Sequence, residues 1–386
     1  MDPGEARALS EAGVTFQEVS RSGQARTGIL HTKHGPVHTP AFMPVATQGI
    51  VKAMTLDQVR ATGAQMLIMN TYHLWLRPGP LEVKELGGLH ALCRWPHPIV
   101  TDSGGFQAFS LAARTKLSED GFEFASHIDG RRLKLTPEGA MEIQAALGSD
   151  VAMQLDVCPP GGAPRPEVEA AVERTTRWAQ RTLVARDPNQ AVFGIVQGGV
   201  HADLRKRHAE ELGALSVDGR AFDGLAFGGF SVGEPTSHMH ELLPEVTPYL
   251  DSARVRYLMG VGTPQDLLIG IGSGIDLFDC VMPTRNARNG HVFVRGGRLN
   301  MKNATHRSDS RVIEPGCDCV ACAGGYTRAY LRHLYVAGEM SVFALLSAHN
   351  LRFYARLLEG ARDAIAQGDF AAYKAYHFSP SQLELK

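Results

Sequence analysis

Asp279 and the two arginines that follow it are the residues whose types and spacing most clearly suggest chemistry. Asp279 ends a short apolar run, and Arg285 and Arg288 follow within one loop's reach of its carboxylate. A carboxylate can attack an anomeric carbon, and guanidinium groups can hold the phosphates on either side of that carbon. The segment therefore predicts a nucleophile beside a phosphate clamp. The alternative is a solvated loop whose arginines pair with Asp276 and Asp279, and the segment alone leaves both open.

Asp102 is a second carboxylate at the end of an apolar run. Two glycines follow it and let a ligand approach the backbone, and Phe106 offers a flat face on which a base can stack. Two carboxylates are the expected pair for displacement at an anomeric carbon, one attacking and one managing protons. The alternative role of Asp102 is to cap the helix that follows.

Polar groups at other run ends could read the edge of a purine. Asp156 and Gln197 supply carboxylate and amide groups, and the glycines at 228 and 229 supply main-chain donors and acceptors. His73 also follows such a run, but a hydrogen-bonded structural role explains it better, so it is left out of the catalytic set.

A cysteine cluster predicts a structural zinc site. Three thiolates and one imidazole complete a tetrahedral zinc site with no position left for water. The imidazole lies in a helical pattern, so the metal would join this helix to the cysteine loop. The alternative, free cysteines beside a core histidine, requires the thiols to cluster by chance. The expected ligands are Cys317, Cys319, Cys322 and His349.

The charge distribution indicates a local site for a polyanion. The chain has 386 residues and a formal net charge of -1, so its overall field would not attract nucleic acid. Residues 285–311, however, hold seven basic side chains against one acid, Asp309. Nucleic acid is therefore a plausible partner. The basic residues are Arg285, Arg288, Arg295, Arg298, Lys302, Arg307 and Arg311.

Eight short apolar runs, separated by helix-like segments, predict the fold. Buried parallel strands have this pattern, and amphipathic stretches such as Pro166 to Leu183 are typical of crossover helices. We expect an α/β fold, a (β/α)₈ TIM barrel, in which the strand ends open into one mouth. The runs are Ala41 to Val45, Met66 to Asn70, Ile99 to Asp102, Val151 to Asp156, Phe193 to Gln197, Gly224 to Gly228, Arg256 to Met259 and Ile275 to Asp279.

Two segments interrupt the barrel pattern. Residues 121–135 alternate around an Asp-Gly turn and predict an inserted β-hairpin before a helix near Thr136. After Asp279, strands and the cysteine cluster precede helices expected at 327–337 and 339–367. We therefore expect a catalytic barrel over 1–300, a zinc-binding subdomain over 301–350 and a C-terminal helix over 351–386 that packs back on the barrel.

The N-terminus and the cysteine pattern bear on the compartment. The first residues are acidic without an apolar signal region, and no apolar stretch is long enough to span a bilayer. The clustering of the cysteines is more typical of metal binding in a reducing compartment than of a disulfide framework. We expect a cytoplasmic protein without membrane contact.

Five motifs and the zinc ligands together resemble the tRNA-guanine transglycosylase family, and its bacterial, queuine-pathway branch fits best. The resemblance covers roughly residues 25–370 and implies a zinc-bearing (β/α)₈ barrel. The motifs are TDSGGFQ at 101–107, GIVQGG at 194–199, FGGFSVGE at 227–234, YLMGVGTP at 257–264 and FDCVMPTRNARNG at 278–290.

The resemblance implies a double displacement on tRNA. Asp279 would attack C1′ of the wobble guanosine in tRNAs with a GUN anticodon, leaving a covalent RNA intermediate, and Asp102 would act as general acid and base. 7-Aminomethyl-7-deazaguanine would then replace guanine with net retention. Asn70 would orient Asp102 and the ribose, and Arg285 and Arg288 would grip the anticodon loop. The residues implied to bind the base are Asp102, Phe106, Asp156, Gln197, Gly229 and Met259.

Further implications concern the pocket and assembly. Cys158 and Val232 fall where bacterial members keep a pocket for the aminomethyl base. The chain departs from the family pattern at Val157, usually acidic, at Phe230, usually leucine, and in a zinc-ligand interval that is one residue longer than usual. A homodimer is expected, with contacts resembling the family's cluster at Leu74, Tyr326, Tyr330 and His333.

Two other functions fit parts of the sequence. A non-catalytic tRNA-binding barrel would keep the fold and zinc but lose the nucleophile, and the presence of both Asp102 and Asp279 argues against it. A retaining hydrolase of nucleosides or glycosides would use water in the second step, and the basic segment is surplus to that reaction.

Overall fold

The computed structural model describes residues 13–110, 115–230 and 232–378 and confirms the predicted barrel. In these residues one sheet of nine strands has the order β4-β15-β14-β13-β12-β11-β7-β6-β5, with every pairing parallel. β4 (Ala41–Met43) and β5 (Val45–Ala46) are the two parts of the first barrel strand, and they pair with the last and second strands to close the sheet. The other strands are β6 (Leu67–Met69), β7 (Ile99–Thr101), β11 (Val151–Met153), β12 (Ala191–Val196), β13 (Gly224–Phe227), β14 (Val255–Leu258) and β15 (Leu277–Asp279).

Alternating side chains of the strands fill two cores. In β12 all six residues are buried. Phe193 and Ile195 belong to the cluster inside the barrel, whereas Val192 and Val196 belong to the cluster between sheet and helices. Burial on both faces explains why these strands form continuous apolar runs in the sequence.

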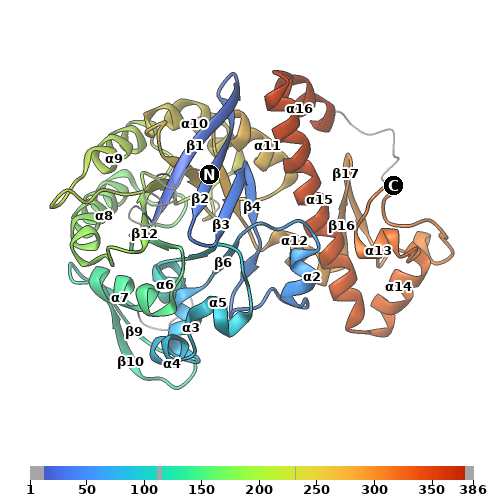
Figure 1. Ribbon diagram of the computed structural model, residues 1–386, viewed down its shortest axis with the longest axis horizontal. Coiled ribbons are helices and arrows are strands. Elements are labelled where there is room, and N and C mark those ends of the chain that lie inside the picture. Colours follow the sequence, from blue (N-terminus) through green and yellow to red (C-terminus); the bar gives the residue numbers. More distant parts are fainter. Residues whose placement is uncertain (1–12, 111–114, 231, 379–386) are drawn as a thin grey trace, which may run out of the picture.

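Helices surround the barrel (Figure 1). Among them, the amphipathic stretch expected to be a crossover helix forms α8 (Arg165–Ala185), whose buried face includes Val168, Val172 and Trp178. The remaining helices of the described barrel region are α2 (Leu56–Arg60), α3 (Thr71–Leu76), α4 (Pro80–Glu85), α5 (Gly88–Cys93), α6 (Gly105–Ser110), α7 (Pro137–Leu147), α9 (Ala202–Ala214), α10 (Thr236–Val246), the 3₁₀ turn η1 (Thr247–Tyr249), α11 (Pro264–Gly272) and α12 (Met282–Arg288).

The inserted hairpin is present where the sequence predicts it. β9 (Phe122–Ala125) pairs antiparallel with β10 (Arg132–Leu135), and a short β8 (Lys116–Leu117) pairs with the other edge of β9. Thr136 then caps α7, accepting a hydrogen bond from the amide of Gly139. The helix start near Thr136 is confirmed.

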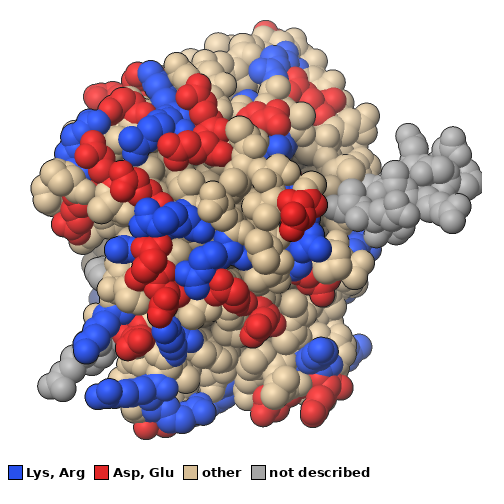
Figure 2. Space-filling model, turned by 90° about the vertical axis from the view of Figure 1, so that its left-hand side faces the viewer, with Lys and Arg blue, Asp and Glu red and all other residues tan. Residues whose placement is uncertain are grey.

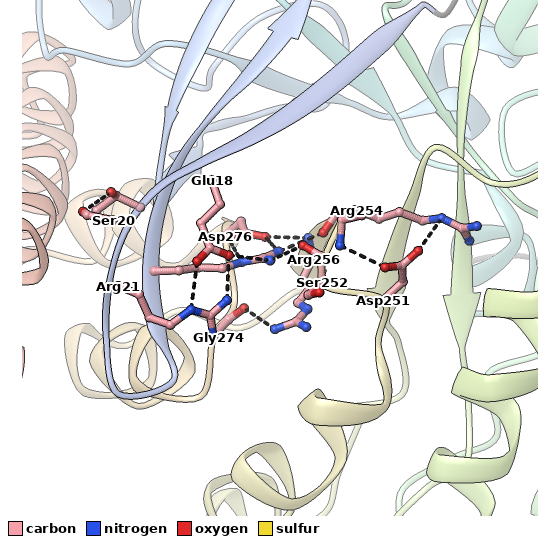
Figure 3. Close-up of polar contacts among 12 residues, drawn as sticks. Glu18, Ser20, Arg21, Asp251, Ser252, Arg254, Arg256, Gly274 and Asp276 are labelled. Carbon is pink, nitrogen blue, oxygen red and sulfur yellow. Dashed lines mark hydrogen bonds and ion pairs between the residues drawn. The ribbon is translucent and has the colours of Figure 1, made fainter.

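A three-stranded sheet lies across the N-terminal end of the barrel. It consists of β1 (Val14–Ser22), β2 (Ala25–Thr32) and β3 (Gly35–Thr39). Arg26 of β2 forms a fully buried ion pair with Asp276 (Nη2–Oδ2 2.6 Å), and Asp276 also accepts the amide of Arg256 at 2.7 Å. Figure 3 shows the polar network around Asp276. Asp276 therefore does not pair with the arginines that follow Asp279.

The C-terminal segment lies beside the barrel, with the long helix α15 (Ser341–Ala366) between the two (Figure 1). Leu351 and Leu358 of α15 join the core under the barrel helices, whereas Val342 and Leu346 join a separate cluster with the three clustered cysteines. The predicted helices at 327–337 and 339–367 are confirmed. The other elements are β16 (His291–Val294), β17 (Gly297–Asn300), the 3₁₀ turn η2 (Ala304–His306), α13 (Val320–Ala323), α14 (Arg328–Ala337) and α16 (Phe370–Phe378).

In the described parts of the chain, no helix combines the length and the apolar character that crossing a membrane requires.

Candidate active site and metal centre

Asp102 lies at the C-terminal end of β7 and is held by three donors. Its Oδ1 accepts the amides of Thr71 (2.9 Å) and Gly104 (3.1 Å). Its Oδ2 accepts the side-chain amide of Asn70 at 2.6 Å. Asn70 is itself fixed, because its Oδ1 caps α3 by accepting the amide of His73 at 3.0 Å. The carboxyl group is thus oriented by the end of the neighbouring strand.

The surroundings of Asp102 favour its protonated form. Burial raises the pKa of Asp102 to about 7, against three hydrogen bonds that lower it, and the negative charge of Asp279 raises it further. Asp279 ends β15, which runs parallel to β7 in the same closed sheet, so the two carboxylates, far apart in sequence, share one mouth of the barrel. In a parallel barrel the C-terminal ends of all strands meet at one mouth, and this places together the two carboxylates that were singled out from the sequence.

Asp279 ends β15, and its Oδ1 accepts two hydrogen bonds. The donors are the hydroxyl of Tyr257 at 2.5 Å and the amide of Gly260 at 2.8 Å. Within the described residues Oδ2 has no hydrogen-bond partner. Burial raises the pKa of Asp279, while the Tyr257 and Gly260 hydrogen bonds oppose that shift. Sequence analysis missed Tyr257, because a tyrosine inside a buried strand resembles a core residue.

Asp156 and Gln197 form a second polar pair in the same mouth. Gln197 Nε2 donates to Asp156 Oδ2 at 2.6 Å. Burial raises the pKa of Asp156 to about 6, although the Gln197 hydrogen bond lowers it. Gln197 Oε1 is buried and has no hydrogen-bond partner in the described part of the chain. A buried amide oxygen without a partner is a group that a ligand can satisfy.

Gly229 lies directly against that amide. Its φ is +68°, and a Cβ at this position would lie 2.4 Å from Gln197 Oε1. Glycine is therefore required both by the backbone conformation and by the close approach.

A cavity of about 130 Å³ opens beside these groups. Phe106, Asp156, Val157 and Cys158 line it, and the side chain of Phe106 is 51% exposed, so its ring is available for stacking. Met259 does not line this cavity; it is partly buried and packs against the core inside the barrel. Of the expected pair of stacking side chains, only Phe106 is thus placed on the cavity wall.

Arg285 and Arg288 lie on the short helix α12, so the expectation of a loop here was wrong. Arg285 is exposed and Arg288 is half-buried. Burial lowers the pKa of Arg288, and the charge of Arg285 adds to this effect. Among the described residues neither arginine forms an ion pair with a carboxylate. The alternative in which they pair with Asp276 and Asp279 is therefore wrong.

The predicted metal ligands converge in the C-terminal segment. The Nδ1 atom of His349 lies 3.8, 3.5 and 3.5 Å from the sulfurs of Cys317, Cys319 and Cys322, and the four side chains are buried. Zn–S and Zn–N bonds at a tetrahedral angle would place sulfur and nitrogen about 3.6 Å apart. His349 Nε2 lies 2.8 Å from the carbonyl oxygen of Phe293, which leaves Nδ1 free for a metal. The group therefore fits tetrahedral zinc.

The aromatic residues assigned to a dimer contact form a partly exposed row. Tyr330 stacks between Tyr326 (centroids 5.9 Å apart) and His333 (6.5 Å), and Tyr330 is 47% exposed. Leu74, by contrast, is 1% exposed and belongs to the barrel core. Its expected contact with a partner was wrong, because the fold already buries its side chain.

Comparisons with known proteins identify the family. The family model for queuine tRNA-ribosyltransferase matches residues 20–381. A queuine tRNA-ribosyltransferase of Sorangium cellulosum (strain So ce56) is 61% identical over 361 residues, covering 94% of this chain and 90% of that protein. Proteins of the same name from Stenotrophomonas maltophilia (strain R551-3) and Pelotomaculum thermopropionicum are 51% and 50% identical; the alignments cover 93% and 94% of this chain and 95% and 96% of theirs.

Proposed function

The chain belongs to the queuine tRNA-ribosyltransferase family of pentosyltransferases, and we propose that it exchanges guanine at the wobble position of GUN-anticodon tRNAs for 7-aminomethyl-7-deazaguanine. One observation carries the proposed chemistry. Asp102 and Asp279 share a mouth of the barrel, but their surroundings differ. Asp102 has a pKa of about 7, and Asp279 presents one oxygen to its hydrogen-bond donors and leaves the other without a partner in the described chain.

The first displacement would form a covalent intermediate. Oδ2 of ionised Asp279 attacks C1′ of the wobble nucleotide, while the bond from C1′ to N9 of guanine breaks and its electrons go to the base. Protonated Asp102 gives its proton to the departing guanine and becomes a carboxylate. The hydroxyl of Tyr257 and the amide of Gly260 hold Oδ1, so that Oδ2 faces the ribose.

The second displacement reverses these roles. The incoming base loses its N9 proton to Asp102, and its N9 attacks C1′ while the bond from C1′ to Asp279 breaks. Two displacements on one carbon retain its configuration. Asn70 keeps Asp102 in place for both proton transfers, because its amide holds Oδ2 of that carboxyl group.

Asp156, Gln197 and Gly229 would recognise the edge of the base. The Asp156 carboxyl group can accept the ring and exocyclic N–H groups that guanine and its 7-deaza analogue share. The unpartnered Gln197 Oε1 and the main chain at Gly229 provide further polar contacts. Phe106 would cover one face of the base, and we assign the other face to Met259 from the family resemblance. The preference for the aminomethyl base rests on the same resemblance, with Cys158 on the cavity wall.

Residues 285–311 would bind the anticodon loop. Six of their basic side chains have no ion-pair partner among the described residues, whereas the face that carries α8 and α9 mixes both signs (Figure 2). Unpaired arginines can neutralise phosphates, and the unstacked bases of a loop are open to reading. The six are Arg285, Arg288, Arg295, Arg298, Lys302 and Arg307.

We also propose that one structural zinc ion binds Cys317, Cys319, Cys322 and His349. Bound zinc would stabilise the fold by joining α15 to the cysteine loop, and its four protein ligands would leave no open position for a part in bond breaking. The same connection between α15 and the cysteine loop underlies the division of the chain that we propose. It consists of a barrel over 1–300, a zinc-binding subdomain over 301–350 and a final helical region over 351–386.

A homodimer is proposed through the row formed by Tyr326, Tyr330 and His333. Tyrosine is favoured at interfaces because it combines a large apolar area with a polar tip. Tyr330→Ala should shift the protein toward a monomer in sedimentation at micromolar concentration. An unchanged mass would place the contact elsewhere.

Base exchange into an anticodon stem-loop with a U-G-U triplet tests the proposed function. Wild-type protein should incorporate labelled guanine and, separately, 7-aminomethyl-7-deazaguanine, and Asp279→Ala should incorporate neither. The wild type should also leave a denaturant-resistant RNA adduct that Asp279→Ala lacks. Tight RNA binding without incorporation would favour a non-catalytic subunit, and release of base without replacement would favour a hydrolase.

A further inference from the structure

Arg205 is a fully buried arginine that none of the roles above uses. It lies on α9, which follows β12, and its side chain has no solvent exposure. Within the described residues, every hydrogen-bond acceptor of its guanidinium is a main-chain carbonyl. Nε donates to Gly199 (2.7 Å), Nη1 to Gly228 (3.0 Å) and Nη2 to Gly229 (3.2 Å). One side chain thus joins the loop after β12 to the loop after β13.

The same guanidinium stacks on the loop after β13. Its central carbon lies 3.7 Å from the ring centroid of Phe230, a cation–π contact, and Phe230 is only 3% exposed. Phe230 is the position where the family usually has leucine, so the aromatic ring gives this chain a contact that leucine would lack. Only arginine combines a planar stacking surface with a rigid fork of donors.

The two loops that Arg205 joins carry groups assigned to the base. Gln197 directly follows β12, and its amide oxygen lies against Gly229, where an added Cβ would be 2.4 Å away. With so little space, a shift of about 1 Å between the loops would move the amide and the Gly229 main chain out of register with a ligand. The carbonyls of Gly228 and Gly229 are held by Arg205, so their peptide planes are fixed before any ligand arrives.

We propose that Arg205 is a positioning residue for base recognition: by clamping three carbonyls and stacking on Phe230, it sets the spacing between the Gln197 and Gly229 groups that read the purine. This inference rests on the proposed function, because it assigns the base to those groups. Arg205 does not touch the reacting atoms, so it should govern the affinity for the base more than the rate of bond breaking.

A purely structural arginine would behave differently. Burial lowers the pKa of Arg205 to about 9, so the side chain stays charged at neutral pH and its removal leaves three carbonyls without donors. Loss of stability alone therefore does not distinguish the two roles. A selective change in base affinity does.

The test compares Arg205→Lys with a matched control, Arg186→Lys. The side chain of Arg186 is 8% exposed and also binds main-chain carbonyls, those of Ala221 and Gln190, but it lies at the opposite end of β12 and also pairs with the carboxylate of Asp223. Lysine keeps the charge in both variants and loses the planar fork. The folding of each variant is verified first. Each variant is then assayed for KM of guanine, KM of the RNA stem-loop and kcat, and for binding of free guanine by calorimetry.

Arg205→Lys should raise KM and Kd for guanine at least ten-fold while kcat and KM for RNA change less than three-fold. Arg186→Lys should lower the melting temperature without changing any base constant. Equal guanine constants in Arg205→Lys and wild type would overturn the proposal. If the wild type exchanges no base, the proposed function fails on its own, and the calorimetric comparison still decides whether Arg205 positions a purine site.

Phe230→Leu provides a second variant if Arg205→Lys does not fold. It removes the stacked ring and keeps the three carbonyl contacts, so guanine KM should rise by a smaller factor. Where Arg205→Lys does fold, the effects in the double variant should fall short of the product of the single ones, because both act through one contact. Unchanged guanine affinity in Phe230→Leu would overturn the role of the stacked pair in positioning.

Discussion

Replacing Asp102 with asparagine should remove a large part of the pH dependence of stability. The pKa of Asp102 is about 7 in the folded protein against an ordinary value of 3.8. Below pH 3.8 the group is protonated in both the folded and the unfolded state, so its pKa shift does not lower the free energy of unfolding there. As pH rises from 3.8 to 7, the unfolded chain ionises first and gains stability relative to the fold. Above pH 7 both states are ionised and the loss is complete.

The size of the effect follows from the same two values. One pKa unit corresponds to about 1.4 kcal/mol, so Asp102 should lower the free energy of unfolding by about 2.5 kcal/mol between pH 5 and pH 8. Asparagine does not titrate. It would also set its own amide against that of Asn70, which now donates to Oδ2. That clash is independent of pH and cancels when the two pH values are compared.

Urea denaturation of wild type and Asp102→Asn at pH 5 and pH 8 measures the difference. The free energy of unfolding of Asp102→Asn, relative to wild type, should rise by about 2.5 kcal/mol over this range. Asp57→Asn, at a side chain that is 85% exposed, is the control and should show no such trend. A constant difference between wild type and Asp102→Asn would mean that Asp102 is ionised in the fold, and would remove the proton donor from the proposed first step.

Three further outcomes are expected. Tyr257→Phe should lower kcat about ten-fold or more, with both KM values nearly unchanged, because a hydrogen bond to a charged group contributes about 1.5–3 kcal/mol; steady-state exchange kinetics measure this, and a change confined to KM would contradict it. Arg288→Ala should weaken RNA binding and reduce the slope of log Kd against log salt by about 1, while free guanine binds as before; an unchanged slope would remove Arg288 from the phosphate contacts. His349→Ala should lose zinc by metal analysis and expose the C-terminal segment to protease, whereas Cys93→Ser, outside the cluster, should keep both; full zinc content in His349→Ala would contradict the ligand assignment.

The strand ends were predictable because each parallel strand is a buried apolar run with a polar residue after it. Asp102, Asp156 and Gln197 follow such runs, and closure of the sheet brings them to one mouth. The cluster that could hold a metal was predictable for a different reason, since three thiols in six residues have few other uses in a reducing compartment. In both cases a pattern of neighbouring residues in the sequence predicts which distant residues meet in the fold.

Other site residues were not found because their environment hides them. Tyr257 is a buried strand residue by type and position, and only its hydroxyl distinguishes it from a core side chain. Arg205 did leave a signal, because with His208 it occupies the buried face of α9, together with Leu204 and Leu212. A charged residue at an apolar position needs buried partners, but the sequence does not say which ones. The helix α12 was missed because Pro and two Asn residues in MPTRNARN resemble a loop.

The ion pair between Arg26 and Asp276 bears on the order in which the chain folds. The two residues are 250 positions apart, and the first barrel strand likewise pairs with the last. During synthesis, the β1–β3 sheet is therefore made long before its buried partner leaves the ribosome, and Arg26 must stay hydrated until then. Contacts of such long range are formed late and slowly, since a long loop has to close first. Nearly three quarters of the chain must emerge before the barrel can close, and until then its unpaired strand edges are exposed to aggregation.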